Sequence, residues 1–135
     1  MATQIFVNLP VKDLDRSIEF FTRLGYQFNP EFTNKNATCM IVGDDIFVML
    51  LVEEFFKTFT PKKICDTTKD VEVLVCLSCE SRDAVDALVR KAVAAGASTP
   101  NPAKDMGFMY GHGYQDLDGH LWELVYMDMS AMPKT

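Results

Sequence analysis

One acidic residue, Glu123, lies inside the apolar run at residues 121–125, near the C-terminal end of the chain. The run follows Asp118-Gly119, a pair typical of a tight β-hairpin turn because glycine adopts a positive φ without strain. An ionised carboxylate is costly to bury unless it is paired, hydrogen-bonded or bound to a metal. Glu123 is therefore the first candidate for a residue with a chemical role, although a purely structural carboxylate bonded to backbone or tyrosine stays open.

Polar side chains recur at every second position just before that turn, at Tyr110, His112 and Tyr114. Alternate residues of a β-strand share one face, so these three side chains lie together if residues 108–115 form a strand. His112 stands between two glycines, which allow close approach of a ligand or of another backbone. A structural or solvent-facing histidine remains the simpler interpretation of His112.

Two neighbours of Glu123 are expected to behave differently from it. His120 directly follows the turn, and we expect it to be exposed. Trp122 alternates away from Glu123, and we expect it to pack against the helices. The four cysteines lie mostly in apolar runs, where cysteine acts as a small hydrophobe, so we expect core packing in a reducing compartment.

The elements that must position these residues occur twice. In the first half, a strand at residues 5–9 is closed by Pro10. A helix follows, with Asp13 as its N-cap and Gly25 as its stop. Strands are then predicted at residues 38–42 and 46–52.

The second half repeats this order. A strand is predicted at residues 71–78, followed by a helix from the N-cap Ser81 to Gly96 and by strands near residues 108–115 and 120–127. A repeated unit that cannot bury its own sheet face is expected to pair with its copy. Residues 53–69 interrupt the pattern, and we interpret them as a linker whose aromatic residues pack on the core, with a flap over a pocket as the alternative.

The composition excludes several classes of partner. The chain has 135 residues, a formal net charge of −6 and a pI of about 4.8. This balance argues against binding to nucleic acid or to an anionic membrane surface, because both favour clustered lysine and arginine. No segment has the length of a membrane helix, and the N-terminal residues lack the pattern of a signal peptide. We therefore expect a cytoplasmic protein.

Two motifs resemble those of the vicinal oxygen chelate superfamily, which includes glyoxalase I, the bleomycin- and fosfomycin-resistance proteins and the extradiol dioxygenases. They are VKDLDRSIEFF at residues 11–21 and DLDGHLWEL at residues 116–124. The resemblance implies an α+β fold of two βαβββ modules that form a cupped mixed sheet with helices on the outside. It implies one domain, with module one at about residues 1–55, a linker at about 56–69 and module two at about 70–128. It also implies a homodimer.

Metal-dependent members of this superfamily place four ligands, of the types His or Gln, Glu, His and Glu, at positions that can be matched here. The matching positions are Phe6, Met49, Leu74 and Glu123, of which Glu123 alone fits the family pattern. Phe, Met and Leu cannot donate to a hard cation, so the resemblance implies a degenerate site and no metal. Such side chains instead suit the floor of an apolar pocket, with Asn8 on the same strand face as Phe6.

These observations favour a glyoxalase- or bleomycin-resistance-like protein that binds a small organic molecule in an apolar cleft. A first alternative is a lactoylglutathione-lyase-like lyase or isomerase that uses Glu123 as base and His112 or a tyrosine as electrophile. A nickel or zinc ion held by Glu123 and His112 is an extension of that alternative. A second alternative is a non-enzymatic dimeric accessory protein, whose cleft would be filled by side chains. The expected ligand-binding residues are Phe6, Asn8, Met49, Leu74, Tyr110 and Tyr114.

Overall fold

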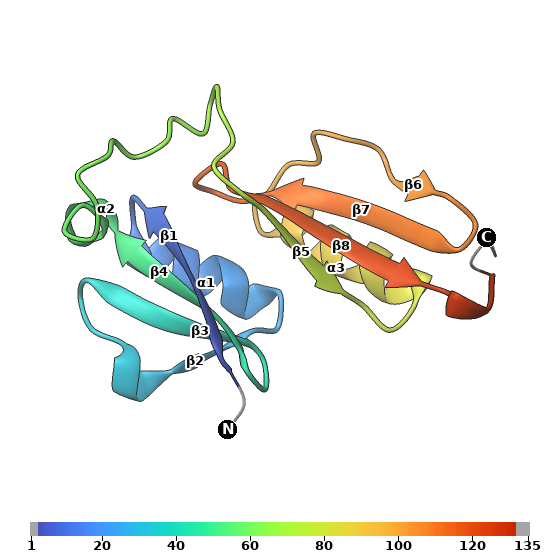
Figure 1. Ribbon diagram of the computed structural model, residues 1–135, viewed down its shortest axis with the longest axis horizontal. Coiled ribbons are helices and arrows are strands. Elements are labelled where there is room, and N and C mark those ends of the chain that lie inside the picture. Colours follow the sequence, from blue (N-terminus) through green and yellow to red (C-terminus); the bar gives the residue numbers. More distant parts are fainter. Residues whose placement is uncertain (1–2, 132–135) are drawn as a thin grey trace. The chain divides into compact units, whose positions relative to one another are not determined.

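The structure is a computed structural model that describes residues 3–131, and the chain divides into two compact units, Met1–Cys65 and Asp66–Thr135. Each unit contains a four-stranded mixed sheet and one helix of ten residues or more (Figure 1). The predicted α+β class and the repeated βαβββ module are confirmed. The boundary between the units falls inside the segment that was expected to be a linker.

Unit 1 is one βαβββ module. Its elements are β1 (Ile5–Val11), α1 (Leu14–Arg23), β2 (Gln27–Asn29), a 3-10 turn at Pro30–Phe32, β3 (Ala37–Gly43), β4 (Ile46–Val52) and the short helix α2 (Glu53–Phe56). The strand order is β1-β4-β3-β2. β1 is parallel to β4, and the other pairs are antiparallel.

Unit 2 repeats this topology. Its elements are β5 (Leu74–Ser78), α3 (Arg82–Ala94), β6 (Lys104–Asp105), β7 (Met109–Gln115), β8 (Leu121–Met127) and a 3-10 turn at Met129–Ala131. The strand order is β5-β8-β7-β6, with β5 parallel to β8. The same connection therefore recurs in both halves of the chain, as the repeat in the sequence predicts.

Both long helices begin and end where the sequence predicts. The Asp13 carboxylate accepts a hydrogen bond from the Arg16 N–H at 3.2 Å, and the Ser81 hydroxyl accepts one from the Ala84 N–H at 3.0 Å. These bonds satisfy backbone donors that have no partner within the first helical turn. The helices stop at glycines with positive φ, Gly25 at 104° and Gly96 at 114°.

Two strands were predicted with the wrong bounds, and two short strands were not predicted. β1 continues past Pro10 to Val11, because β1 is an edge strand, where a proline costs little. β5 begins at Leu74 rather than at residue 71. The short edge strands β2 and β6 were not predicted, since two or three residues carry too little pattern to be seen.

The core of each unit lies between its sheet and its long helix. In unit 1 the buried apolar side chains include Leu9, Val11, Leu14, Phe20, Phe21, Leu24, Met40, Val48 and Leu50. In unit 2 they include Val85, Val89, Ala92, Tyr114, Trp122 and Leu124. Trp122 is fully buried, as expected, and stacks on Tyr114 with ring centroids 6.2 Å apart.

Residues 53–69 contain the boundary between the two units. At the N-terminal end of this segment, α2 packs against β1 and β4 of unit 1, and Phe55 meets Phe59 edge to face at 5.2 Å. At the other end, the Thr67 hydroxyl donates to the Asp118 carbonyl at 2.7 Å, which attaches this end to the β7–β8 turn of unit 2. The segment is thus divided between the two units.

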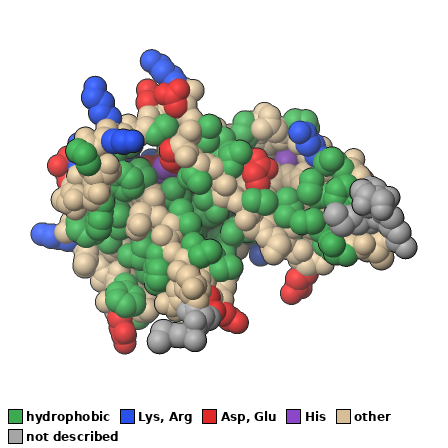
Figure 2. Space-filling model, viewed as in Figure 1, with side chains coloured by type: hydrophobic (Ala, Val, Ile, Leu, Met, Phe, Trp, Pro, Cys, Tyr) green, Lys and Arg blue, Asp and Glu red, His purple; other side chains and the backbone are tan. Residues whose placement is uncertain are grey.

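Lys and Arg side chains are scattered on the face drawn in Figure 2, with apolar and acidic side chains between them. None of the helices within residues 3–131 is both long enough and apolar enough to cross a membrane.

Candidate functional site

The strand register assigns the side chains of the unit 2 sheet to two faces. One face, here called the helix face, carries Trp122 and Leu124, which are fully buried between the sheet and α3. The other, here called the pocket face, carries Leu121, Glu123 and Val125. Directly paired residues of neighbouring strands share a face, so the register also assigns the residues of β5, β6 and β7.

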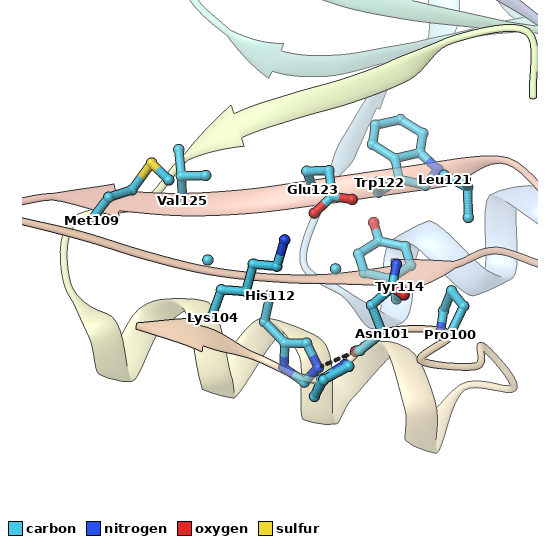
Figure 3. Close-up of a pocket in the computed structure, with 13 residues that line it drawn as sticks. Pro100, Asn101, Lys104, Met109, His112, Tyr114, Leu121, Trp122, Glu123 and Val125 are labelled. Carbon is cyan, nitrogen blue, oxygen red and sulfur yellow. Dashed lines mark hydrogen bonds between the residues drawn. The ribbon is translucent and has the colours of Figure 1, made fainter. Parts of the chain in front are cut away.

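A pocket of about 280 Å³ lies on unit 2. It is lined by Pro100, Asn101, Pro102, Lys104, Met109, Gly111, His112, Gly113, Tyr114, Leu121, Trp122, Glu123 and Val125 (Figure 3). The pocket exists because Gly111 and Gly113 pair with Val125 and Glu123 on the pocket face, where they leave β7 without side chains. The walls come from β8 on one side and from β6 with residues 100–102 on the other.

Glu123 is only partly buried, so the expectation of a buried acid was wrong. Its carboxylate lies over Gly113, where an added Cβ would come within 3.0 Å of Oε2. Among the residues that the structure describes, the Glu123 carboxylate has no hydrogen-bond or ion-pair partner. It therefore faces the pocket as an unpaired negative charge.

Cys76 lies directly beside Glu123 across the β5–β8 pair. It is exposed, which corrects the expectation that the cysteines pack in the core; Cys39 is buried as expected. Partial desolvation, and then the neighbouring Glu123 charge, raise the pKa of the Cys76 thiol. This environment keeps the thiol protonated and makes Cys76 a poor nucleophile near neutral pH.

Lys104 forms the opposite wall, and it was not among the predicted site residues because β6 was not predicted. It pairs with Gly111, so its side chain shares the pocket face with Glu123. Figure 3 shows Lys104 extending from β6 across β7 toward β8. The next residue, Asp105, lies on the helix face and accepts a forked hydrogen bond from Arg82 at 2.6 and 3.0 Å.

His112 and the two predicted tyrosines lie on the helix face, opposite Glu123. They pair with Leu124, Tyr126 and Trp122, and this register contradicts the expectation of one polar cluster with Glu123. The Tyr110 hydroxyl donates to Asp86 of α3 at 2.6 Å, and Tyr114 is only 1 % exposed. The His112 Nε2 lies 3.2 Å from the Asn101 carbonyl and points away from Glu123 (Figure 3).

The other predicted site residues lie outside the unit 2 pocket. Phe6, Asn8 and Met49 share one face of the unit 1 sheet, where Asn8 pairs with Met49 and the Phe6 ring stacks on Phe47 at 4.9 Å. Leu74 is 56 % exposed and pairs with Leu121, which places it on the pocket face of unit 2 but not among the lining residues. The structure thus separates the six expected ligand-binding residues into three groups.

The donors around Glu123 do not fit a metal site of the kind found in the superfamily. Cys76 pairs with Glu123 across β5 and β8 and could join it, whereas His112 lies on the opposite face of the sheet. Within residues 3–131, no group of three His, Cys, Asp or Glu side chains could hold an ion. A catalytic zinc site usually uses three protein ligands, so we derive no metal chemistry for Glu123.

A buried polar network beside the pocket was not foreseen. The Asp116 carboxylate is 8 % exposed and accepts hydrogen bonds from the Trp122 indole and from the backbone N–H groups of Asp118 and His120. Burial raises the pKa of Asp116 despite these donors. His120 is 3 % exposed, so the expectation that it faces solvent was wrong; its Nδ1 contacts the Glu72 carboxylate at 2.5 Å.

Comparison with known proteins supports the resemblance over both modules. Residues 3–43 match the family model for the N-terminal part of bleomycin resistance protein-like proteins. No curated protein sequence matches the chain. Among solved structures, a hypothetical protein from S. aureus is 26 % identical, with a TM-score of 0.79 over 93 % of this chain and 95 % of that one.

Two further solved structures are similar in fold to this chain, and their names describe a family or a resistance function. A glyoxalase/bleomycin resistance protein/dioxygenase family enzyme from Burkholderia phytofirmans PsJN is 17 % identical, with a TM-score of 0.77 over 93 % of this chain and 99 % of that one. A fosfomycin resistance protein from Listeria monocytogenes is 14 % identical, with a TM-score of 0.69 over 97 % of this chain and 98 % of that one. The resemblance to the vicinal oxygen chelate superfamily is thereby confirmed, in sequence over most of the first module and in fold over nearly the whole chain.

Proposed function

We propose that the protein binds a small organic molecule in the unit 2 pocket, with Glu123 as the polar anchor and without a metal ion. The observation that carries this proposal is the unpaired Glu123 carboxylate at a pocket whose floor is kept open by Gly111 and Gly113. A charged group that finds no partner in the protein gains most from a ligand of opposite charge. The anchor therefore favours a ligand that carries an amine.

The lining of the pocket agrees with this function. Met109, Leu121 and Val125 provide apolar surface around the carboxylate, and Pro100 and Pro102 stiffen the opposite wall. Sites for small molecules are mostly apolar, with a few placed polar groups, and have volumes of about 300–1,000 Å³. At about 280 Å³, this pocket suits a small ligand or one part of a larger molecule.

The two alternatives receive less support. A lyase that pairs Glu123 with His112 needs both groups at one reacting centre, whereas the register directs their side chains to opposite faces of the sheet. An accessory protein without a ligand would have its sheet face filled by side chains, whereas Gly111 and Gly113 leave space. Sequestration of a toxic compound, as the names of the bleomycin- and fosfomycin-resistance relatives suggest, is the role we propose for such binding.

Filling the pocket from its floor tests the proposal. An added Cβ at Gly111 would meet its nearest neighbour at 3.5 Å, so the Gly111→Leu side chain is accommodated at its base and occupies the pocket. We expect isothermal titration calorimetry to detect binding of phenethylamine to the wild type, weaker binding of 2-phenylethanol, and neither with Gly111→Leu. The control Val93→Leu, at an exposed position of α3, should bind like the wild type.

Metal dependence is tested on the same protein. Protein purified without chelators should contain no stoichiometric nickel or zinc by elemental analysis, and Glu123→Gln should not change its affinity for either ion. A stoichiometric ion that is lost in Glu123→Gln would contradict the metal-free proposal. Failure of the wild type to bind any of the aromatic probes would contradict the ligand-binding function itself.

A further inference from the structure

We infer that the pocket is built for a zwitterion: a small apolar amino acid whose ammonium group meets Glu123 and whose carboxylate meets Lys104. This inference rests on the proposed ligand-binding function and adds a second, oppositely charged recognition group to it. Lys104 is the one lysine or arginine among the pocket-lining residues. The chain as a whole has a formal net charge of −6. Its pocket nevertheless contains the positive charge of Lys104 as well as the unpaired negative charge of Glu123.

The register places the two charges on the same face of the sheet. Lys104 pairs with Gly111, and Glu123 pairs with Gly113, so both side chains stand on the pocket face of unit 2. Neighbouring strands lie about 4.8 Å apart, and two residues span about 7 Å along a strand. The two charged side chains therefore begin on opposite walls, diagonally across a floor that carries no side chains.

The direction of Lys104 is fixed from the other face of the sheet. β6 has only two residues, and both are exposed, so apolar packing cannot orient it. Instead, the Arg82 guanidinium of α3 donates two bonds to the Asp105 carboxylate and one to the Gly107 carbonyl at 3.0 Å. Because successive strand residues point to opposite faces, holding Asp105 on the helix face directs Lys104 into the pocket.

Neither charge is satisfied by the protein. Among the residues that the structure describes, no ion pair or hydrogen bond involves the side chain of Lys104 or of Glu123, although both line the same pocket. The space between them is bordered by Met109, Leu121 and Val125. An apolar amino acid matches all three features, because its two charges complement the walls and its side chain covers the apolar surface.

Four matched probes separate the contributions of the two charges. Phenylalanine carries both groups, phenethylamine only the ammonium, 3-phenylpropionate only the carboxylate, and 2-phenylethanol neither. A site built to bond both groups discriminates against analogues that lack one of them. We expect phenylalanine to bind about 5- to 10-fold more tightly than either singly charged probe, the ratio that one partly exposed charge-assisted bond provides.

Variants assign each preference to its residue. Lys104→Met should abolish the preference for phenylalanine over phenethylamine. Glu123→Gln should abolish the preference for phenylalanine over 3-phenylpropionate. Lys91→Met, at an exposed lysine of α3, makes the same charge change away from the pocket and should leave all ratios unchanged. Circular dichroism and thermal unfolding would establish that each variant is folded.

The outcomes distinguish this inference from the function on which it rests. If phenethylamine binds as tightly as phenylalanine and Lys104→Met has no effect, the zwitterion inference is overturned while ligand binding anchored by Glu123 stands. If 2-phenylethanol binds as well as the charged probes, both charges are irrelevant and only an apolar pocket remains. If none of the four probes binds the wild type at millimolar concentration, both the inference and the proposed function fail.

Discussion

The carboxylate of Glu123 lies directly over Gly113, its cross-strand partner on β7. An added Cβ at Gly113 would stand 3.0 Å from Glu123 Oε2 and 2.5 Å from the carbonyl oxygen of Trp122. The first contact is tight, and the second is shorter than real Cβ atoms allow. Glycine at this position therefore sets both the path of β7 and the place where the charge of Glu123 faces the pocket.

We predict that Gly113→Ala lowers the free energy of unfolding and weakens ligand binding. The new methyl group must displace backbone of β8, and overpacking of this kind costs about 1–3 kcal/mol. Urea unfolding followed by circular dichroism would measure the loss. Gly111→Ala is the matched control, since its Cβ would meet its nearest neighbour at 3.5 Å, an ordinary contact. Equal stability of the two variants would show that Gly113 has no special steric role.

Asp116 supplies a second prediction, which concerns the base of the β7–β8 hairpin. Asp116→Asn replaces an acceptor by an amide whose N–H₂ group must face either the Trp122 indole N–H or two backbone N–H groups. A buried donor left without its acceptor costs about 1–3 kcal/mol. We therefore expect a loss of that size in the free energy of unfolding at pH 7, measured by urea titration.

The same variant has a pH signature. The folded-state pKa of Asp116 is raised, chiefly by burial, so the folded protein holds this proton more tightly than the unfolded chain does. Its titration contributes stability that is present below the ordinary pKa of 3.8 and is lost as pH rises through the raised value. The stability advantage of the wild type over Asp116→Asn should therefore shrink as pH rises from 4. An advantage that grows over this range would mean that hydrogen bonding, not burial, dominates at Asp116.

The third prediction concerns the reactivity of the Cys76 thiol, which depends on how close Glu123 lies to it. The Glu123 charge helps to raise the pKa of the Cys76 thiol, and the thiolate is the reactive form. Glu123→Gln removes that charge, so the pKa should fall toward its ordinary value and alkylation of Cys76 by iodoacetamide at pH 8 should become faster. Mass spectrometry of the modified peptides would separate Cys76 from buried Cys39, which stays unmodified in both proteins. An unchanged rate would place Glu123 too far from the thiol to act on it.

The fold could be predicted from the sequence because its signals are local and redundant. Asp13 and Ser81 begin the two long helices, and glycines with positive φ end them. The strands next to the helices carry enough β-branched and apolar residues to be recognised. The edge strand β6 could not be seen, because its two residues are charged and its place depends on a contact with Arg82 of a distant helix.

The site was harder to predict because it depends on which face each strand residue occupies. Alternation correctly placed Trp122 in the core and Glu123 opposite to it. Alternation alone could not show that Gly113 pairs with Glu123, while His112 and Tyr114 pair with the residues on either side of it. A difference of one residue in the register of two strands exchanges the faces, and the observed register places His112 on the face opposite Glu123. His120 was misplaced for another reason: its partner Glu72 is 48 residues away in the sequence.

The last prediction concerns Arg82, which we regard as a positioning residue for Lys104. Arg82 holds the pKa of Asp105 down from 3.8 to about 2, chiefly through its hydrogen bonds to the carboxylate. In Arg82→Gln the pKa of Asp105 should therefore rise toward 3.8, as NMR titration of the side-chain carboxyl carbon would show. Because a depressed pKa stabilises the fold above the ordinary value, this contribution is lost in the wild type as pH falls from about 4 to about 2.

Binding provides the readout that a merely structural salt bridge would not change. If Arg82 directs Lys104 through Asp105, Arg82→Gln should weaken phenylalanine binding by about as much as Lys104→Met, within the 5- to 10-fold range expected for one charge-assisted bond. Binding of phenethylamine should be unaffected, because Glu123 is held by β8 and not by β6. Arg90→Gln is the matched control, an exposed arginine on the same helix. An equal loss of affinity for both probes in Arg82→Gln would indicate general loosening of the sheet edge instead of a specific effect on Lys104.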